Sequence, residues 1–296
     1  MTGAPVRPVH DPARAALLEL VGEILDLEHL EVDLFRGRSP RKATQRVFGG
    51  QVAGQALVAA GRTVARDRPV HSLHGYFVRP GRPATPIVYR VHRIRDGRSF
   101  TTRRVDALQH GETIFTMSAS FHGDEPGLAH QEAMPAAPPP ESLPTPREAF
   151  LLAGRDTPRN ILPFDLRRVG EDGWRAGTDP ERTTQVWLRA ADGLGDDPLL
   201  HACLLTYASD LTLLSGVTYA HRLEAFGADD GRVAMASLDH AVWFHRPFRV
   251  DDWLLFDQES PTAAGGRGLA RGHFFDRAGR HVASAVQEGL VRVRPQ

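Results

Sequence analysis

The chain has 296 residues, of which 41% are hydrophobic and 24% charged, and its 36 basic and 36 acidic residues leave a formal net charge of zero. This composition predicts a folded protein of one large or two small domains and excludes low-complexity sequence. A balanced charge gives no overall field that would favour nucleic acid or anionic lipid, so we expect neither as a partner.

Cys203 is the only cysteine, which excludes an internal disulfide and every zinc site built from paired cysteines. We expect it to pack in the core. The sequence starts without an apolar leader and has no run near the roughly 20 apolar residues of a membrane span. These features predict a soluble, unprocessed, cytoplasmic protein that binds no membrane and no metal.

The first predicted element is an amphipathic helix over residues 13–34, where apolar side chains recur at helical spacing among acidic ones. A second, buried helix is expected to start near the glycines of Phe48-Gly-Gly-Gln-Val. The next segment changes to strand patterns separated by turn sequences, which predicts an antiparallel meander. Its four expected strands are 71–78, 86–95, 100–109 and 113–121.

The proline-rich residues 126–147 predict an extended connector between two domains, residues 1–125 and residues 148–296. The same order of elements then returns. The second half is expected to hold a strand at 184–190, a helix at 198–214 and strands at 233–243, 253–259, 268–275 and 281–291.

Short sequences recur between the halves at a nearly constant spacing: Phe77-Val-Arg-Pro returns as Phe244-His-Arg-Pro, and the turn at Gly111 returns at Gly279. A long helix followed by antiparallel strands allows the sheet to wrap around the helix. The pattern therefore predicts an α+β double hotdog, with two tandem hotdog repeats that each have a long central helix. Two unrelated α+β domains would leave the recurrence unexplained.

Three polar residues stand out in apolar surroundings of the second half: Asp210 on the predicted helix, and Ser237 and Gln287 on strands. A carboxylate among apolar residues needs hydrogen-bond partners or has a functional role, although an exposed aspartate or a helix cap would also explain Asp210. Strands that wrap the helix can bring the three side chains together around one water. The chain has no Gly-x-Ser-x-Gly elbow, phosphate-binding loop or His-Glu-x-x-His helix, which excludes the corresponding enzyme classes.

Several motifs in order along residues 13–292 resemble the acyl-CoA thioesterase II family. They are Phe48-Gly-Gly-Gln-Val-Ala-Gly-Gln-Ala-Leu, His71-Ser-Leu-His-Gly-Tyr-Phe-Val-Arg-Pro-Gly, Tyr207-Ala-Ser-Asp-Leu, Leu238-Asp-His-Ala-Val-Trp-Phe-His-Arg-Pro-Phe and Val286-Gln-Glu-Gly. The resemblance implies a double hotdog enzyme that hydrolyses fatty acyl-CoA to free fatty acid and CoA without a cofactor. Its catalytic aspartate, hydroxyl and glutamine match Asp210, Ser237 and Gln287, with Ser where a familiar member has Thr.

An activated water suffices for this chemistry because a thioester has a good leaving group. Asp210 would be the general base, and Ser237 and Gln287 would orient the water. The backbone of Gly49, Gly50 and Gln51 at a helix start is the candidate oxyanion site. His74 lies in a family motif and is either a substrate contact or a structural strand histidine.

Ala119 occupies the first-half position that matches Gln287, so we expect one active site per chain. A hotdog enoyl-CoA hydratase or dehydratase is an alternative, but the adjacent Asp239 and His240 would point to opposite faces of a strand. A noncatalytic acyl-CoA binding module is a further alternative. We expect acyl-CoA as the substrate and assembly into a homo-oligomer.

Overall fold

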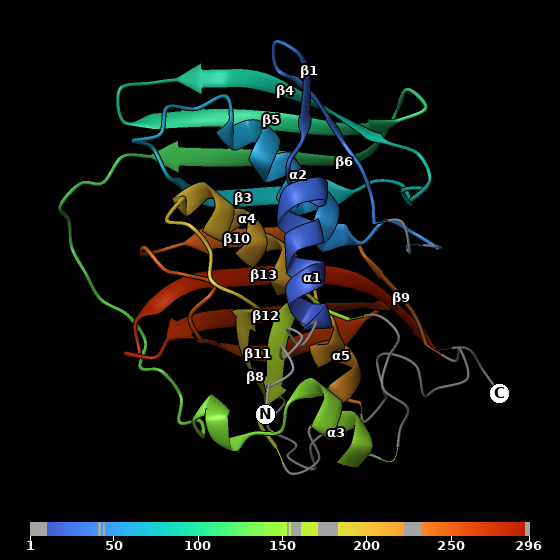
Figure 1. Cartoon of the computed structure of the whole chain (residues 1–296), viewed down its shortest axis with the longest axis vertical. Coiled ribbons are helices and arrows are strands. Elements are labelled where there is room, and N and C mark those ends of the chain that lie inside the picture. The colour runs from blue at the N-terminus through green and yellow to red at the C-terminus, as the bar shows by residue number, and fades with distance from the viewer. Residues whose placement is uncertain are drawn as a thin grey trace, which may run out of the picture.

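The computed structural model describes residues 11–40, 43, 45–152, 154, 161–170, 183–221 and 233–293. Its strands belong to one 13-stranded antiparallel sheet, against which the helices pack (Figure 1). The strands are β1 (Glu28–Glu31), β2 (Leu34–Gly37), β3 (Val70–Phe77), β4 (Ile87–Asp96), β5 (Phe100–Gln109), β6 (Glu112–His122), β7 (Phe164–Arg168), β8 (Thr183–Ala190), β9 (Val233–Ser237), β10 (Asp239–Phe244), β11 (Leu254–Ala264), β12 (Arg267–Asp276) and β13 (His281–Val293). The helices are α1 (Pro12–Glu19), α2 (Gly49–Gly61), α3 (Pro146–Leu152), α4 (Pro198–Ser209) and α5 (Ser215–Tyr219), with a π-helical turn at Leu20–Ile24 and a 3₁₀ turn at Pro140–Ser142.

The order of the strands shows the internal duplication. The sheet runs β1-β2-β4-β5-β6-β3-β10-β13-β12-β11-β8-β7, and β9 pairs with β13. Outward from the central β3–β10 pair, each half therefore presents its strands in the same relative order. This is the double hotdog arrangement that the sequence predicts, with the two repeats joined edge to edge into one continuous sheet.

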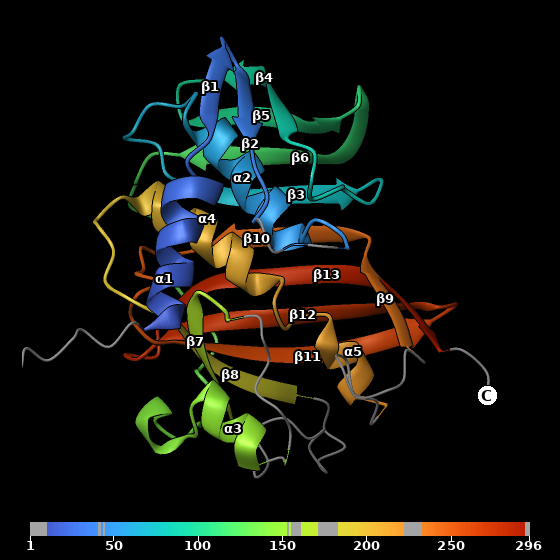
Figure 2. The same cartoon turned by 45° about the vertical axis from the view of Figure 1, so that its right-hand side comes forward.

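The two central helices, α2 and α4, lie on the same side of this sheet and pack against each other (Figure 2). Glycines permit the contact: a Cβ at Gly50 would lie 2.5 Å from the carbonyl oxygen of Tyr207, and one at Gly54 would lie 3.2 Å from that of Cys203. Both helices are buried along most of their length. Their close approach brings the N-terminal end of α2 beside the C-terminal end of α4.

The helix predicted over residues 13–34 is correct only for its first part. Helical structure ends at Ile24, and residues 28–37 form the hairpin of β1 and β2, which turns at Asp33 with φ of 58°. The hairpin adds β2 to β4 and buries Phe35. The apolar spacing was compatible with a helix, but pairing with the exposed edge of β4 satisfies the backbone of this segment instead.

The second half also differs from its predicted elements. The helix expected over 198–214 ends at Ser209, and the strand expected over 233–243 is broken at Leu238 into β9 and β10. The break lets two successive strands pair with β13. β7, which pairs with β8 at the edge of the sheet, was not predicted.

The proline-rich segment descends along one side of the molecule, from β6 of the first repeat to α3 (Figure 1). The Trp187 indole donates a hydrogen bond to the carbonyl of Pro138 at 2.8 Å, and Gln131 donates to that of Gly279 at 2.8 Å. Met134 packs against a small apolar cluster that includes Trp253. The segment therefore covers apolar sheet surface as well as connecting the repeats.

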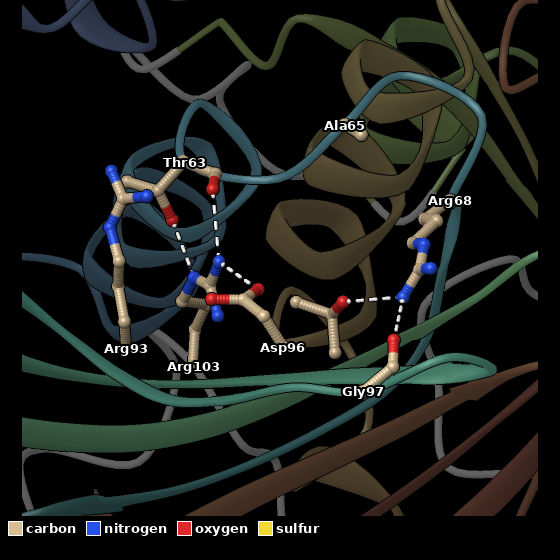
Figure 3. Close-up of a pocket in the computed structure, with 8 residues that line it drawn as sticks. Thr63, Ala65, Arg68, Arg93, Asp96, Gly97 and Arg103 are labelled. Carbon is tan, nitrogen blue, oxygen red and sulfur yellow. Dashed lines mark hydrogen bonds and ion pairs between the residues drawn. The ribbon is translucent and has the colours of Figure 1, made fainter.

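A buried arginine secures the C-terminal end of α2. Arg103 on β5 is 1% exposed and donates hydrogen bonds to the Thr63 hydroxyl and carbonyl, to the carbonyls of Arg95 and Thr102, and to the Asp96 carboxylate at 2.6 Å (Figure 3). All five N–H groups of the guanidinium are thus used within the protein. Arg103 therefore ties the sheet to the loop that leaves α2.

We expect Arg103→Met to lower the free energy of unfolding by about 2–4 kcal/mol, because it leaves several acceptors without their donor. Arg104→Met is the matched control, since the neighbouring Arg104 side chain is 48% exposed, and it should change stability by less than about 0.5 kcal/mol. Chemical denaturation of both variants measures the difference. Equal losses would contradict the anchoring role of Arg103.

Candidate active site

Asp210 stands at the C-terminal end of α4, as its C-cap residue, with φ of −83° and ψ of −6°. The helix ends where hydroxyl side chains bond back to the preceding turn: the Ser209 hydroxyl donates to the carbonyl of Thr206 at 2.9 Å. The chain leaves the helix at Asp210, whose side chain accepts a hydrogen bond from the Gly50 amide at the start of α2.

Three donors from separate segments converge on the Asp210 carboxylate. The Gln287 side-chain amide on β13 donates to Oδ1 at 2.6 Å, and the Ser237 hydroxyl at the end of β9 donates to Oδ1 at 3.4 Å. The Gly50 backbone N–H of α2 donates to Oδ2 at 2.7 Å. The structure thus brings together the three residues that the sequence predicts as a catalytic group.

The pKa of the Asp210 carboxyl group lies close to neutral pH. Burial raises the pKa of Asp210 to about 6, while the hydrogen bonds from Gln287, Gly50 and Ser237 act in the opposite direction and limit the rise. Among the described residues, no ion pair involves Asp210. A carboxylate held by neutral donors in a buried place keeps the basicity that a general base requires.

Gly49 and Gly50 allow the carboxylate to reach the start of α2. A Cβ at Gly49 would lie 2.8 Å from Asp210 Oδ2 and 2.9 Å from the ring of Phe77. The N-terminal amides of a helix have no intrahelical partners and carry partial positive charge, which favours an anion there. The structure shows that the Gly50 amide, expected from the sequence as an oxyanion donor, is bonded to Asp210.

The side chain of Gln51 has a structural position. It is 2% exposed and donates to the carbonyl of Arg38 at 3.1 Å and to the Ser39 hydroxyl at 3.1 Å. The neighbouring Gln55 accepts a hydrogen bond from the Tyr89 hydroxyl at 2.6 Å. The sequence analysis did not foresee this buried network, although two glutamines one turn apart in an apolar helix were a visible signal.

The structure does not bring His74 to Asp210. His74 is exposed on β3, opposite Ala241, and its ring packs edge-on against Trp243 at 4.8 Å. Its neighbour Leu73 is fully buried. Because side chains alternate along a strand, His74 lies on the face of the sheet opposite to that of α2 and α4.

The first repeat lacks the corresponding groups. The C-cap of α2 is Arg62, where α4 has Asp210, and Ala119 is buried on β6, the strand that corresponds to β13. Cys203 lies fully buried in the middle of α4, where burial raises the pKa of its thiol. A buried, protonated thiol is poorly suited to nucleophilic attack, so Cys203 is a packing residue.

A cavity of about 330 Å³ lies beside Arg103, with Arg68 and Arg93 on its sides (Figure 3). It adjoins Thr63, after the C-terminal end of α2, whereas Asp210 meets the opposite end of that helix. This cavity is therefore separate from the Asp210 site.

Across the part of the chain that the structure describes, no three metal-ligating side chains are grouped so that they could hold an ion. No helix in those same residues is both long and apolar enough to cross a membrane.

Comparison with known proteins decides the family. A family model described as acyl-CoA thioesterase matches residues 171–290, and one described as the acyl-CoA thioesterase N-terminal domain matches residues 38–122. Acyl-coenzyme A thioesterase 8 from Homo sapiens is 39% identical over 302 residues, which cover 97% of this chain and 93% of that protein. The chain belongs to the acyl-CoA thioesterase family. Acyl-CoA thioesterase 2 from Haemophilus influenzae is 35% identical and covers 91% of this chain and 96% of its own length.

One solved structure agrees with this family assignment, and a more distant one agrees with the fold. The acyl-CoA thioesterase II TesB2 from Mycobacterium marinum superposes with a TM-score of 0.78 at 48% identity, over 94% of this chain and 99% of that one. A protein described as having a hot dog fold, from Alicyclobacillus acidocaldarius, superposes with a TM-score of 0.74 at 19% identity, over 92% of this chain and 98% of that one. The predicted family and the double hotdog fold are both confirmed, and members of this family are thioester hydrolases.

We expect Gly49→Ala to reduce thioester hydrolysis at least tenfold, because the added methyl must displace the Asp210 carboxylate or the Phe77 ring, and a displacement of about 1 Å can cost 10²-fold in rate. Gly22→Ala is the matched control, since a Cβ there meets nothing within 4 Å. Steady-state kinetics of the two folded variants test the prediction, and wild-type turnover in Gly49→Ala would refute it.

Proposed function

We propose that this chain hydrolyses fatty acyl-CoA thioesters to free fatty acid and CoA, with Asp210 as the general base for a water. The convergence of Gln287, Ser237 and the Gly50 amide on one half-buried carboxylate supports the proposal most strongly. The arrangement holds a base of raised pKa beside groups that can orient a water.

In the proposed reaction, water attacks the thioester carbonyl carbon while Asp210 accepts its proton. The resulting tetrahedral oxyanion collapses, the carbon–sulfur bond breaks, and protonated Asp210 returns the proton to the departing CoA thiolate. Because Gly50 is engaged by Asp210, we assign the oxyanion to the neighbouring backbone amides of Gly49 and Gln51 at the start of α2. No covalent enzyme intermediate is needed.

The alternatives receive less support. A hotdog hydratase would need an acid and a base that act together on the substrate. His240 is buried on β10, whereas the adjacent Asp239 accepts a hydrogen bond from the Glu288 backbone N–H at 2.6 Å, so the two do not form such a pair. A noncatalytic binding module gives no reason to bury an ionisable carboxylate among three donors.

Further features of the function remain part of the proposal. We infer that the division into residues 1–125, 126–147 and 148–296 describes two repeats and a connector, and that only the second repeat supplies the base. We also infer a cytoplasmic enzyme of fatty acid metabolism that assembles into a homo-oligomer. We propose His74 only as a candidate substrate contact, on the face of the sheet opposite to α2 and α4.

The direct test is release of thiol from a panel of acyl-CoA substrates, short to long, by the wild type and variants. Asp210→Asn should lower kcat at least 10³-fold, because an amide cannot accept the proton of water. Ser237→Ala and Gln287→Ala should lower kcat more than they raise KM. If Asp210→Asn keeps an activity within threefold of the wild type, Asp210 is not the general base. Cys203→Ala should keep its activity, because Cys203 is a packing residue.

Loss of fold is not expected to explain the loss of activity. Burial raises the pKa of Asp210 in the folded state, so this group stabilises the fold at low pH, and that contribution is lost as the pH rises through about 6. Asp210→Asn cannot ionise and should be as stable as the wild type at pH 8 or more stable, by up to about 3 kcal/mol. Thermal unfolding at pH 8 measures this.

We expect the rate to fall on the acid side with a midpoint near pH 6, because the unprotonated Asp210 carboxylate is the active form. A profile of kcat/KM between pH 4.5 and 8 measures the midpoint. Gln287→Leu removes a donor that lowers the pKa of Asp210, so its acid limb should move to higher pH. An unchanged limb in that variant would show that another group controls it.

A further inference from the structure

We propose that His240 is a positioning residue for the reaction, which holds Ser209 and thereby fixes where α4 ends and Asp210 begins. The inference depends on the proposed function of Asp210 as base. Among the described residues, His240 makes no hydrogen bond to the carboxylate or to its three donors, so its N–H would act through Ser209.

The hydrogen bonds define the state of the imidazole. His240 is 1% exposed on β10, and its Nε2 lies 2.7 Å from the Ser209 hydroxyl. That hydroxyl donates its own hydrogen to the carbonyl of Thr206 at 2.9 Å. It can therefore only accept from His240, which assigns the proton to Nε2 and leaves Nδ1 with a lone pair.

Two neighbouring strands thus hold two successive residues at the end of α4. On β10, His240 donates to Ser209; on β13, Gln287 donates to Asp210. The antiparallel pairing of Ala241 with Val286 places His240 and Gln287 opposite each other on the same face of the sheet. Two hydrogen bonds, to Ser209 and to Asp210, therefore fix the end of α4, and together they restrict its position more than either bond alone.

The surroundings of His240 argue against a role in stability alone. Its Nδ1 and the Gln287 Oε1 are buried without a hydrogen-bond partner among the described residues. An unpaired buried acceptor destabilises the fold relative to an apolar side chain of similar size. Burial also lowers the pKa of His240 to about 4, so the imidazole is neutral at pH 7 and supplies no charge to Asp210. What it supplies is a directed N–H donor.

Substitutions can separate this donor from the rest of the ring. In His240→Gln the amide nitrogen can take the place of Nε2, whereas in His240→Asn it can reach only the place of Nδ1. We expect His240→Asn and His240→Leu to lower kcat about tenfold or more with KM nearly unchanged, and His240→Gln to recover most of the rate. Ser209→Ala deletes the same hydrogen bond, so adding it to His240→Asn should cause no further loss.

The assay uses the full chain, thiol release from one acyl-CoA, and thermal unfolding to confirm that each variant is folded, with Asp210→Asn measured alongside. Equal rates for His240→Asn and His240→Gln, or additive losses in the double variant, would overturn the role of His240. If Asp210→Asn is inactive while a folded His240→Leu keeps wild-type kcat, this inference alone fails. If Asp210→Asn is active, the proposed function fails first.

Discussion

Partial burial of the Asp210 carboxylate between the ends of two helices is the constraint on which the rest of the site depends. A charge in this position requires donors, and they come from both repeats: the Gly50 amide from the first, and Ser237 and Gln287 from the second. No single repeat contains the complete set. The continuous sheet through β3 and β10 and the close packing of α2 on α4 therefore do more than stabilise the molecule, because they fix the distance between donors that lie far apart in the sequence.

The two copies of the hotdog unit put polar groups to different uses. In the first repeat, buried polar side chains such as Gln55 and Arg103 are satisfied by partners within the protein and join the helix to strands and loops. In the second repeat, the C-cap of the central helix is an aspartate instead of the Arg62 of the first. If Asp210 is the proposed base, this one acid at the end of α4, facing the glycine-rich start of α2, makes the duplicated fold asymmetric in its chemistry.

Much of this arrangement was predictable from the sequence, because strands with alternating burial and a repeated Phe-x-Arg-Pro carry local signals. The meander of β3 to β6 followed from such signals, whereas the grouping of Asp210, Ser237 and Gln287 was expected from polar residues in apolar segments and from the resemblance to the acyl-CoA thioesterase II family. The hairpin at residues 28–37 did not, since its pattern also fits a helix and only the open edge of β4 selects a strand. The bond from Gly50 to Asp210 and the bond from His240 to Ser209 join segments distant in sequence through backbone or ring atoms, which residue patterns do not encode.

The three hydrogen bonds to Asp210 differ in length, and the difference bears on its proposed role as general base. The amides of Gln287 and Gly50 approach to 2.6 and 2.7 Å, one on each oxygen, whereas the Ser237 hydroxyl is 3.4 Å away. The amides fix the orientation of the carboxylate without supplying a proton that could neutralise it. The long contact to Ser237 is weak, and a hydroxyl can rotate to accept from or donate to a water at little cost. In the proposed reaction, the rigid donors would therefore set the position of Asp210 as base, and the loosely bound Ser237 would be the group best suited to bind the water.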